Sequence, residues 1–275
     1  MPGLRITAIL TTHRRPGPML RALASITAER RRPDEILVVE DGADPGMPER
    51  LRATGIPCRL LSRPLSSVAK ARNLGLREAR GDWVIYLDDD DVAYPNRLEE
   101  LEAAALEGCP AFVYGSTLMV KSGERIPVPT HHPGADGAAG FQDILVCMPH
   151  TNSILFSRQA LLDSGGFVEA SSYFSDWCAL LHILDRAPKA SPARRVGSLL
   201  AEFRVGDEGM THEVARDRSM RAKILEAFAN LRLERTEHLE LVGRMRSAVE
   251  AAGVITDYSH YAQVASGTLQ TLQPF

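Results

Sequence analysis

Short apolar segments and longer amphipathic segments alternate along the first 120 residues of the chain. The apolar segments have the length and composition of buried parallel strands, and they are residues 5–10, 36–39, 58–61, 84–87 and 112–120. The amphipathic segments have apolar residues on one helical face, and they are residues 16–29, 66–79 and 95–108. Strands that alternate with helices predict an α/β fold, in which a mostly parallel sheet is flanked by helices and joined by right-handed crossovers.

The pattern changes after residue 120. Residues 121–140 are rich in Gly, Pro and Ala, and a loop of this length is usually functional or disordered, so we treat it as a candidate lid. The elements expected next are strands at residues 153–156 and 198–205, and helices at residues 158–164 and 176–187. Residues 213–251 have a charged, helical pattern. We therefore divide the chain into residues 1–120, residues 121–212 and a helical C-terminal extension, residues 213–275.

Composition narrows the class of protein. Hydrophobic residues make up 44% and charged residues 24% of the chain, as in ordinary globular proteins, and the net charge of −3 gives no electrostatic reason to expect nucleic acid as a partner. No apolar stretch approaches the roughly 20 residues that a membrane span needs, and the N-terminus lacks a signal-peptide layout. The cysteines are scattered and form no C-x-x-C, so neither a zinc site nor a disulfide framework is indicated. We expect no transmembrane segment and a cytoplasmic location.

The apolar segment at residues 84–87 ends abruptly in four carboxylates, Asp88 to Asp91. In open α/β sheets, ligands bind at the carboxyl ends of the strands. Oxygen ligands of this kind suit Mg²⁺ or Mn²⁺ rather than zinc, with one or two carboxylates and substrate phosphates sharing the ion. In a turn at the strand end, Asp88 and Asp90 can converge on one point while Asp89 turns away. The alternative is a solvated acidic turn.

Two other strand ends carry polar residues. The first expected strand runs into Thr11-Thr12-His13-Arg14-Arg15-Pro16, and the second into Glu40-Asp41-Gly42. Neither a G-x-G-x-x-G in the first turn nor a G-K-[ST] occurs, so the dinucleotide fingerprint and the P-loop are both missing.

Together with the acids, several segments in order resemble the inverting GT-A glycosyltransferases of family 2, in the nucleotide-diphospho-sugar transferase superfamily. They are residues 9–16 (ILTTHRRP), 38–42 (VVEDG), 71–75 (ARNLG), 81–91 (GDWVIYLDDDD), 165–167 (GGF) and 175–177 (SDW), and the resemblance covers about residues 5–212. It implies a Rossmann-like GT-A fold in which residues 1–120 bind the nucleotide sugar and residues 121–212 bind the acceptor. The family usually has Asp-Asp-Gly-Ser where this chain has Glu40-Asp41-Gly42-Ala43.

The resemblance also implies the chemistry: a metal-dependent glycosyltransferase of the hexosyltransferase type (EC 2.4). A sugar would move with inversion from a UDP-, GDP- or dTDP-sugar to the hydroxyl of a saccharide, a lipid-linked acceptor or a small molecule. Mn²⁺ or Mg²⁺ would bind at the D-x-D motif, with Asp90 as direct ligand, Asp91 supporting the site and His212 as a late ligand. The residues matched to the nucleotide sugar are Thr11, Thr12, Arg14, Glu40, Asp41, Lys70, Arg72, Asn73, Asp88, Asp89 and Arg204.

An inverting transfer needs a general base that takes the proton of the acceptor hydroxyl. By resemblance Asp176 fills this role, with Ser175 in place of the usual acidic neighbour. On the acceptor side we expect His150, Asn152 and Trp177, although Trp177 would equally fill a core.

Other functions remain open at this point. A sugar-phosphate nucleotidyltransferase shares the sheet and the use of carboxylates with a metal, but it characteristically has a Gly-rich loop with Arg and Lys after the first strand, which this chain lacks. A non-catalytic nucleotide-sugar-binding module is a further alternative, and the metal site alone does not exclude a retaining enzyme. The extension, residues 213–275, is expected either to shape the acceptor pocket or to form a homodimer interface.

Overall fold

The structure, a computed structural model, describes residues 3–121, 123–127, 137–171, 173–187, 193–205, 220–255 and 258–270. Its centre is one sheet whose first half contains the parallel neighbours β3 (Arg59–Arg63), β2 (Glu35–Asp41), β1 (Ile6–Thr12) and β4 (Trp83–Asp88). The sheet continues through β9 (Ile154–Ser157), β6 (Phe112–Lys121), β10 (Ala193–Val205) and β5 (Val92–Ala93). On this second half, β7 (Glu124–Pro127) pairs with β6, and β8 (Gly137–Ala139) pairs with β10.

The predicted α/β architecture is confirmed, with one qualification about the sheet. Strand β9 lies between β4 and β6 and runs antiparallel to both, so β6 is not the direct neighbour of β4. Strands β6 and β10 are again parallel to each other. The sheet is therefore mostly parallel, with antiparallel strands in its second half.

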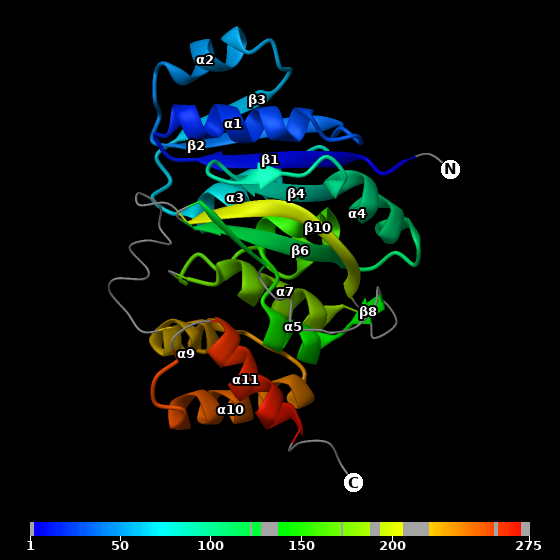
Figure 1. Cartoon of the computed structure of the whole chain (residues 1–275), viewed down its shortest axis with the longest axis vertical. Coiled ribbons are helices and arrows are strands. Elements are labelled where there is room, and N and C mark those ends of the chain that lie inside the picture. Colours follow the sequence, from blue (N-terminus) through cyan, green and yellow to red (C-terminus); the bar gives the residue numbers. More distant parts are fainter. Residues whose placement is uncertain are drawn as a thin grey trace.

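Helices cover both faces of the sheet (Figure 1). Along the chain they are α1 (Pro16–Thr27), α2 (Met47–Ala53), α3 (Val68–Glu78), α4 (Arg97–Leu106), α5 (Phe141–Cys147), the 3-10 turn η1 (Thr151–Ser153), α6 (Arg158–Asp163), α7 (Ser175–Arg186), α9 (Met220–Asn230), α10 (Thr236–Ala251) and α11 (Tyr258–Gln270). Alternate residues of β4 enter different cores: Val84 and Tyr86 pack with α3 and α7, whereas Ile85 and Leu87 pack with α1 and α4. Because both faces of β4 are buried, its sequence is apolar throughout.

The register of the parallel strands brings the candidate residues to one edge. Thr11 at the end of β1 is opposite Asp88 at the end of β4, and Thr12 is opposite Glu40 at the end of β2. The carboxyl ends of these three strands therefore form a single polar edge, which is where open α/β sheets bind their ligands.

The C-terminal helices α9, α10 and α11 lie at the end of the molecule opposite α2 and β3 (Figure 1). They share a hydrophobic core with α5 and α7, and the hydroxyl of Tyr261 in α11 donates a hydrogen bond to the carbonyl of Leu145 in α5 (2.6 Å). Among the described residues, no helix is long and apolar enough to cross a membrane.

Several elements differ from the sequence expectations. The expected helix at residues 213–251 is described from residue 220 and is interrupted between α9 and α10, and α11 lies within the expected helical extension, residues 213–275. Part of the candidate lid, residues 121–140, is ordered as β7 and β8, while residues 122 and 128–136 lie outside the described residues. The short helices α2 and α5 were not predicted. The strand expected at residues 198–205 begins earlier, at Ala193.

Candidate active site

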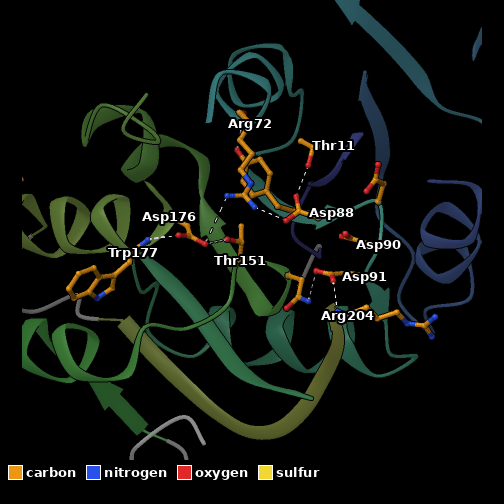
Figure 2. A network of polar contacts seen from close by, with 12 residues as sticks. Thr11, Arg72, Asp88, Asp90, Asp91, Thr151, Asp176, Trp177 and Arg204 are labelled. Atoms are coloured by element: carbon orange, nitrogen blue, oxygen red, sulfur yellow. Dashed lines mark hydrogen bonds and ion pairs between the residues drawn. The ribbon is translucent and has the colours of Figure 1, made fainter. Parts of the chain in front are cut away.

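Asp88 is the last residue of β4, and two groups from neighbouring elements hold its carboxylate (Figure 2). Thr11 Oγ1 donates to Asp88 Oδ1 at 2.6 Å, and Arg72 Nη2 of α3 donates to Asp88 Oδ2 at 2.7 Å. Burial opposes ionisation of Asp88, but the Arg72 guanidinium and the Thr11 hydroxyl outweigh it, so the pKa of Asp88 lies below its usual value. Asp88 is therefore an ionised carboxylate at neutral pH.

Asp91 points into the protein from the same turn. Its carboxylate is 3% exposed and accepts hydrogen bonds from Asn152 Nδ2 (2.9 Å) and from the backbone N–H of Arg204 (3.1 Å). Burial, together with the nearby carboxylates of Asp88 and Asp90, raises the pKa of Asp91 well above its usual value. Asp91 thus links the acidic turn to η1 and β10.

Asp89 and Asp90 are both bound by Arg15, which precedes α1. Arg15 Nε donates to Asp89 Oδ2 at 3.2 Å, and its Nη2 makes a second, shorter bond to Asp89 Oδ1. Arg15 Nη1 donates to Asp90 Oδ2 at 3.0 Å. Thr12 Oγ1 donates to Asp89 as well (2.7 Å), and burial raises the pKa of Asp89 to about 6. Asp89 is therefore turned away from Asp88, toward β1 and Arg15.

The acidic turn could hold a metal ion only together with oxygen atoms supplied by a substrate. Among the residues that the structure describes, no group of three or more His, Cys, Asp or Glu side chains could enclose a metal. Asp88 and Asp90 offer oxygen ligands from one turn, and Mg²⁺ and Mn²⁺ accept one or two carboxylates when substrate phosphates supply further oxygens. His212, the other expected ligand, lies outside the described residues.

Arg72 connects this acidic turn to the candidate base. Its guanidinium is buried and lies 5.4 Å from the centre of the Phe167 ring. Its Nη1 is 4.0 Å from Asp176 Oδ2, and Nη2 is bound to Asp88. Asp176 lies in the first turn of α7, and its Oδ2 also accepts a hydrogen bond from the hydroxyl of Thr151. Asp88 and Asp176 therefore flank one guanidinium (Figure 2).

His150 is the acceptor-side candidate that the structure brings to this place. Its ring packs on Phe203 (4.4 Å between ring centres), and the buried Nδ1 has no hydrogen-bond partner in the described part of the chain. Burial lowers the pKa of His150, although the carboxylates of Asp176 and Asp88 act in the opposite direction. The ring is therefore neutral at pH 7, beside the two carboxylates.

Two acceptor-side predictions need correction, because the side chains are in the core. Trp177 is 1% exposed, its Nε1 donates to the carbonyl of Ile144 (2.8 Å), and its ring packs on Phe228 and Tyr261. Asn152 is also 1% exposed and is bound to Asp91. Trp177 stabilises the packing of α7, and Asn152 fixes the acidic turn.

The expected nucleotide-side residues divide into two groups. Glu40 accepts hydrogen bonds from Ser62 Oγ (2.6 Å) and from the backbone of Asp44 (3.1 Å), while its buried Oε1 finds no partner among the described residues. Asp41 accepts backbone hydrogen bonds from Leu65 (2.6 Å) and Ser66 (3.1 Å). Both carboxylates thus hold the loops at the carboxyl end of β2, and one oxygen of Glu40 stays available to accept a hydrogen bond.

Four further residues were expected on the nucleotide side: Arg14, Lys70, Asn73 and Arg204. Arg14 and Lys70 are exposed. Asn73 is buried and binds the backbone of Phe167 on both its N–H and its carbonyl, at 2.8 Å each, so it joins α3 to the loop before α7 rather than facing the edge. The side chain of Arg204 lies near Glu202 (3.3 Å) and extends away from Asp88 and Asp176 (Figure 2).

Sequence reasoning missed three residues that organise the site. Arg15 and Thr151 contact the acids directly. Arg97 forms a fully buried ion pair with Glu29 and donates to the backbone carbonyl of Asn152 (2.9 Å), the residue whose side chain binds Asp91. A charged residue in the apolar face of the helix after the acids was the available signal for Arg97. The signal for Thr151 was its position between His150 and Asn152, which were both expected on the acceptor side.

The sequence is similar to known glycosyltransferases over much of its length. The sequence profile described as Glycosyl transferase family 2 matches residues 7–165, more than half of the chain. An uncharacterized glycosyltransferase of Bacillus subtilis, YwdF, is 27% identical over 212 residues, which are 75% of this chain and 76% of the relative. An uncharacterized glycosyltransferase of Haemophilus influenzae is 25% identical over 166 residues, 57% of this chain and 61% of the relative.

Solved structures show the same fold at low sequence identity. S. aureus TarS superposes with a TM-score of 0.67 at 16% identity, covering 91% of this chain and 44% of TarS. Mannosyltransferase PcManGT from Pyrobaculum calidifontis, in complex with GDP-Man and Mn²⁺, gives a TM-score of 0.65 at 16% identity, covering 98% of this chain and 75% of that chain. The fold is thus that of GT-A glycosyltransferases, and from the profile match we conclude that the chain belongs to glycosyl transferase family 2.

Proposed function

We propose that the protein transfers a hexosyl group from a nucleoside diphosphate sugar to an acceptor hydroxyl, with inversion at the anomeric carbon and with a divalent metal. The observation that carries this proposal is the buried Arg72, which lies between Asp88 and Asp176. Asp88 belongs to the edge where the donor diphosphate is expected, and Asp176 is the candidate base. The reacting carbon would then lie beside this guanidinium, within reach of Asp176.

Two observations support the binding of a nucleotide-sugar donor. A buried carboxylate oxygen of Glu40 without a partner in the described residues suits an N–H or O–H of a base or ribose. TarS has been solved with UDP and with UDP-GlcNAc, and PcManGT with GDP-Man and Mn²⁺. These neighbours favour a nucleotide sugar as donor, and they leave the base and the sugar of this protein open.

Mn²⁺ or Mg²⁺, held by Asp90 and Asp88 with the diphosphate oxygens, would offset the negative charge that develops on the leaving nucleoside diphosphate. The chain's own residues prepare this site. Thr11 and Arg72 keep Asp88 ionised and oriented. Asp91 anchors the turn by accepting a hydrogen bond from Asn152.

Asp176 would act as the general base. The acceptor oxygen attacks the anomeric carbon while its proton passes to Asp176, and the bond from that carbon to the diphosphate oxygen breaks on the opposite face. The Thr151 hydroxyl and the Arg72 guanidinium hold the Asp176 carboxylate in one orientation. His150, neutral and close by, would line the acceptor side. The acceptor is proposed only as a hydroxyl compound: a saccharide, a lipid-linked molecule or a small molecule.

The first test is thermal stabilisation by UDP, GDP, dTDP and CDP, each with and without Mn²⁺. A ligand that binds the native state raises the apparent stability by mass action. We expect one nucleotide to shift the melting temperature only with Mn²⁺, and Asp90→Ala to abolish the shift. Asp82→Ala, at an exposed position just before β4, is the matched control and should keep it.

The reaction itself is then assayed with the sugar derivatives of the nucleotide found. Transfer or slow hydrolysis of the sugar with release of nucleoside diphosphate supports the proposal, and product of inverted configuration supports its stereochemistry. Pyrophosphate formed from NTP and sugar phosphate would replace the proposal with a nucleotidyltransferase, and nucleotide binding without turnover would indicate a binding module.

A further inference from the structure

Arg15 occupies the acidic turn in a way that the proposed function does not explain. Its side chain makes three hydrogen bonds to carboxylates of the turn, two to Asp89 and one to Asp90. Asp90 is the carboxylate expected to bind the metal directly. In this structure the positive partner of Asp90 is therefore an arginine of the chain itself.

The contacts of Arg15 are unequal. Asp89 is 2% exposed, receives two of the guanidinium N–H groups and is also fixed by Thr12. The Asp90 side chain is 30% exposed and receives one N–H from Arg15, at 3.0 Å. A forked pair of hydrogen bonds to a buried carboxylate is harder to break than a single bond to a solvated one. Arg15 can therefore release Asp90 while it stays bound to Asp89.

A divalent cation and Arg15 compete for the same carboxylate. The guanidinium already neutralises Asp90, and two cations that meet at one carboxylate repel each other. A metal that approaches the protein without nucleotide must break the contact between Arg15 and Asp90 and remain close to the positive charge. A diphosphate changes this balance, because its oxygens are good acceptors for the freed Arg15 Nη1.

We propose that Arg15 is the counter-cation of Asp90 in the nucleotide-free protein, and that the donor diphosphate draws Arg15 Nη1 from Asp90 and so opens this carboxylate to the metal. Metal and nucleotide then bind cooperatively, and Arg15 becomes a diphosphate ligand of the loaded enzyme. The inference rests on the proposed function, since it assigns a further positioning residue at the same donor site.

The deciding experiment is a titration of the nucleotide-free protein with Mn²⁺, followed by the electron paramagnetic resonance signal of the free ion. We expect Arg15→Gln to bind Mn²⁺ about tenfold more tightly than the wild type, which corresponds to about 1.4 kcal/mol. Damage to the fold would weaken binding, so a gain cannot arise from misfolding. Arg21→Gln removes the same charge from an exposed position of α1 that has no assigned role in binding, and should leave the Mn²⁺ affinity unchanged.

The second arm repeats the titration with the nucleoside diphosphate that stabilises the wild type. In the wild type the nucleotide should tighten Mn²⁺ binding strongly, and in Arg15→Gln this coupling should shrink by about tenfold. Arg15→Lys keeps the charge but loses the planar fork, so its affinity for Mn²⁺ alone should lie between those of the wild type and Arg15→Gln.

Two outcomes overturn the inference, and they are distinguishable. If the wild type binds Mn²⁺ with nucleotide through Asp90, but Arg15→Gln binds Mn²⁺ alone no more tightly than the wild type, the role of Arg15 is wrong and the proposed function stands. If the wild type binds no Mn²⁺ with any nucleoside diphosphate, the metal-dependent donor site and the role of Arg15 are overturned together.

Discussion

At the scale of single residues, the site is a balance between four aspartates and two arginines. Arg72 holds Asp88 in its ionised form, whereas Asp91, only three residues away, has a raised pKa because burial and two like charges act on it. Arg15 neutralises Asp89 and Asp90 from the other side. Neighbours in the sequence thus have different protonation behaviour because different elements supply their partners.

Asp176→Asn tests the proposed base at this scale. The amide keeps the shape of the side chain and can still accept the Thr151 hydrogen bond, but it cannot take a proton. We expect kcat to fall about 10²- to 10⁴-fold, while the nucleotide-induced thermal shift stays at the wild-type value. Asp163→Asn, which changes a carboxylate at the end of α6, serves as the control. A kcat within a few-fold of the wild type would remove Asp176 from the mechanism.

The sequence indicated which residue types gather at the site, but it was less informative about where each side chain points. A run of acids after an apolar strand predicted the location of Asp88 to Asp91, because strand ends place side chains at a sheet edge. The sequence could not show which of the two neighbours, Arg14 or Arg15, contacts these acids. Arg14 has a positive φ of 53°, and this local turn, which the sequence pattern does not encode, sends only the next side chain to the acids. Trp177 follows a polar site residue yet is buried, since α7 turns it into the core.

At the scale of elements, α7 joins the site to the C-terminal helices. Its first turn carries Asp176, and its other end carries His182 and Asp185. His182 Nε2 accepts the backbone N–H of Arg232 (2.9 Å), and Asp185 accepts those of Glu234 (2.6 Å) and Arg235 (3.2 Å). The segment between α9 and α10 therefore holds the end of α7 that lies away from the site.

The buried His182 predicts acid sensitivity of this junction. Burial, with a smaller effect of Arg186, lowers the pKa of His182 from 6.5 to about 4. Between these two pH values the unfolded chain binds a proton that the folded chain does not, so stability is lost as pH falls from 6.5 toward 4. We expect this histidine to account for about 2–3 kcal/mol of the free energy of unfolding lost between pH 7 and pH 4.5.

The measurement is chemical denaturation at both pH values for the wild type and His182→Gln, whose carboxamide oxygen can still accept the Arg232 N–H. The variant should lose about 2–3 kcal/mol less than the wild type on acidification. His13→Gln, at an exposed position, should lose as much as the wild type. Equal losses in all three proteins would show that His182 does not control the acid sensitivity.

The entry into β4 gives a second prediction at this scale. A Cβ on Gly81 would lie 2.7 Å from the carbonyl oxygen of Arg5 and 2.7 Å from the backbone nitrogen of Thr7. Backbone atoms cannot move aside as side-chain ends do, so we expect Gly81→Ala to destabilise the protein by about 1–3 kcal/mol. Gly243, in α10, has no atom within 4 Å of such a Cβ, and Gly243→Ala should stabilise by about 0.5–1 kcal/mol. Differential scanning calorimetry measures both; melting temperatures that change in the same direction would contradict the argument.

Element types were largely predictable because β1, β2 and β4 are buried, mostly apolar runs and the longer helices each have one apolar face. Some short elements escaped, such as the seven-residue helix α2 and the three-residue strand β8, because so few positions show a period only weakly. Strand β9 was found, but its place between β4 and β6 was not. Pairing over such a distance depends on packing across the whole sheet rather than on local pattern.

At the scale of the whole molecule, the C-terminal helices share one core with α5 and α7. Trp177 of α7 packs on Phe228 of α9 and Tyr261 of α11, and Tyr261 reaches α5 through its hydroxyl. The sequence indicated helices for residues 213–251, but it did not show what they cover, because an apolar helical face does not name its partner. The contacts show that these helices support α5 and α7 from the side away from the sheet.

Tyr261 provides the final test, since it is fully buried where α11 meets α5 and α7. Tyr261→Ala removes a large aromatic ring and leaves a cavity beside Trp177, so we expect a loss of about 3–5 kcal/mol in the free energy of unfolding. The fluorescence of Trp177 should shift to longer wavelength, because its ring loses the cover that now keeps it from water. Leu239→Ala, at a half-exposed position of α10, should change stability by less than about 0.5 kcal/mol and leave the emission unchanged. If Tyr261→Ala retains wild-type stability and emission, α11 does not form part of this core, and the support that it gives to α7 and Asp176 is refuted.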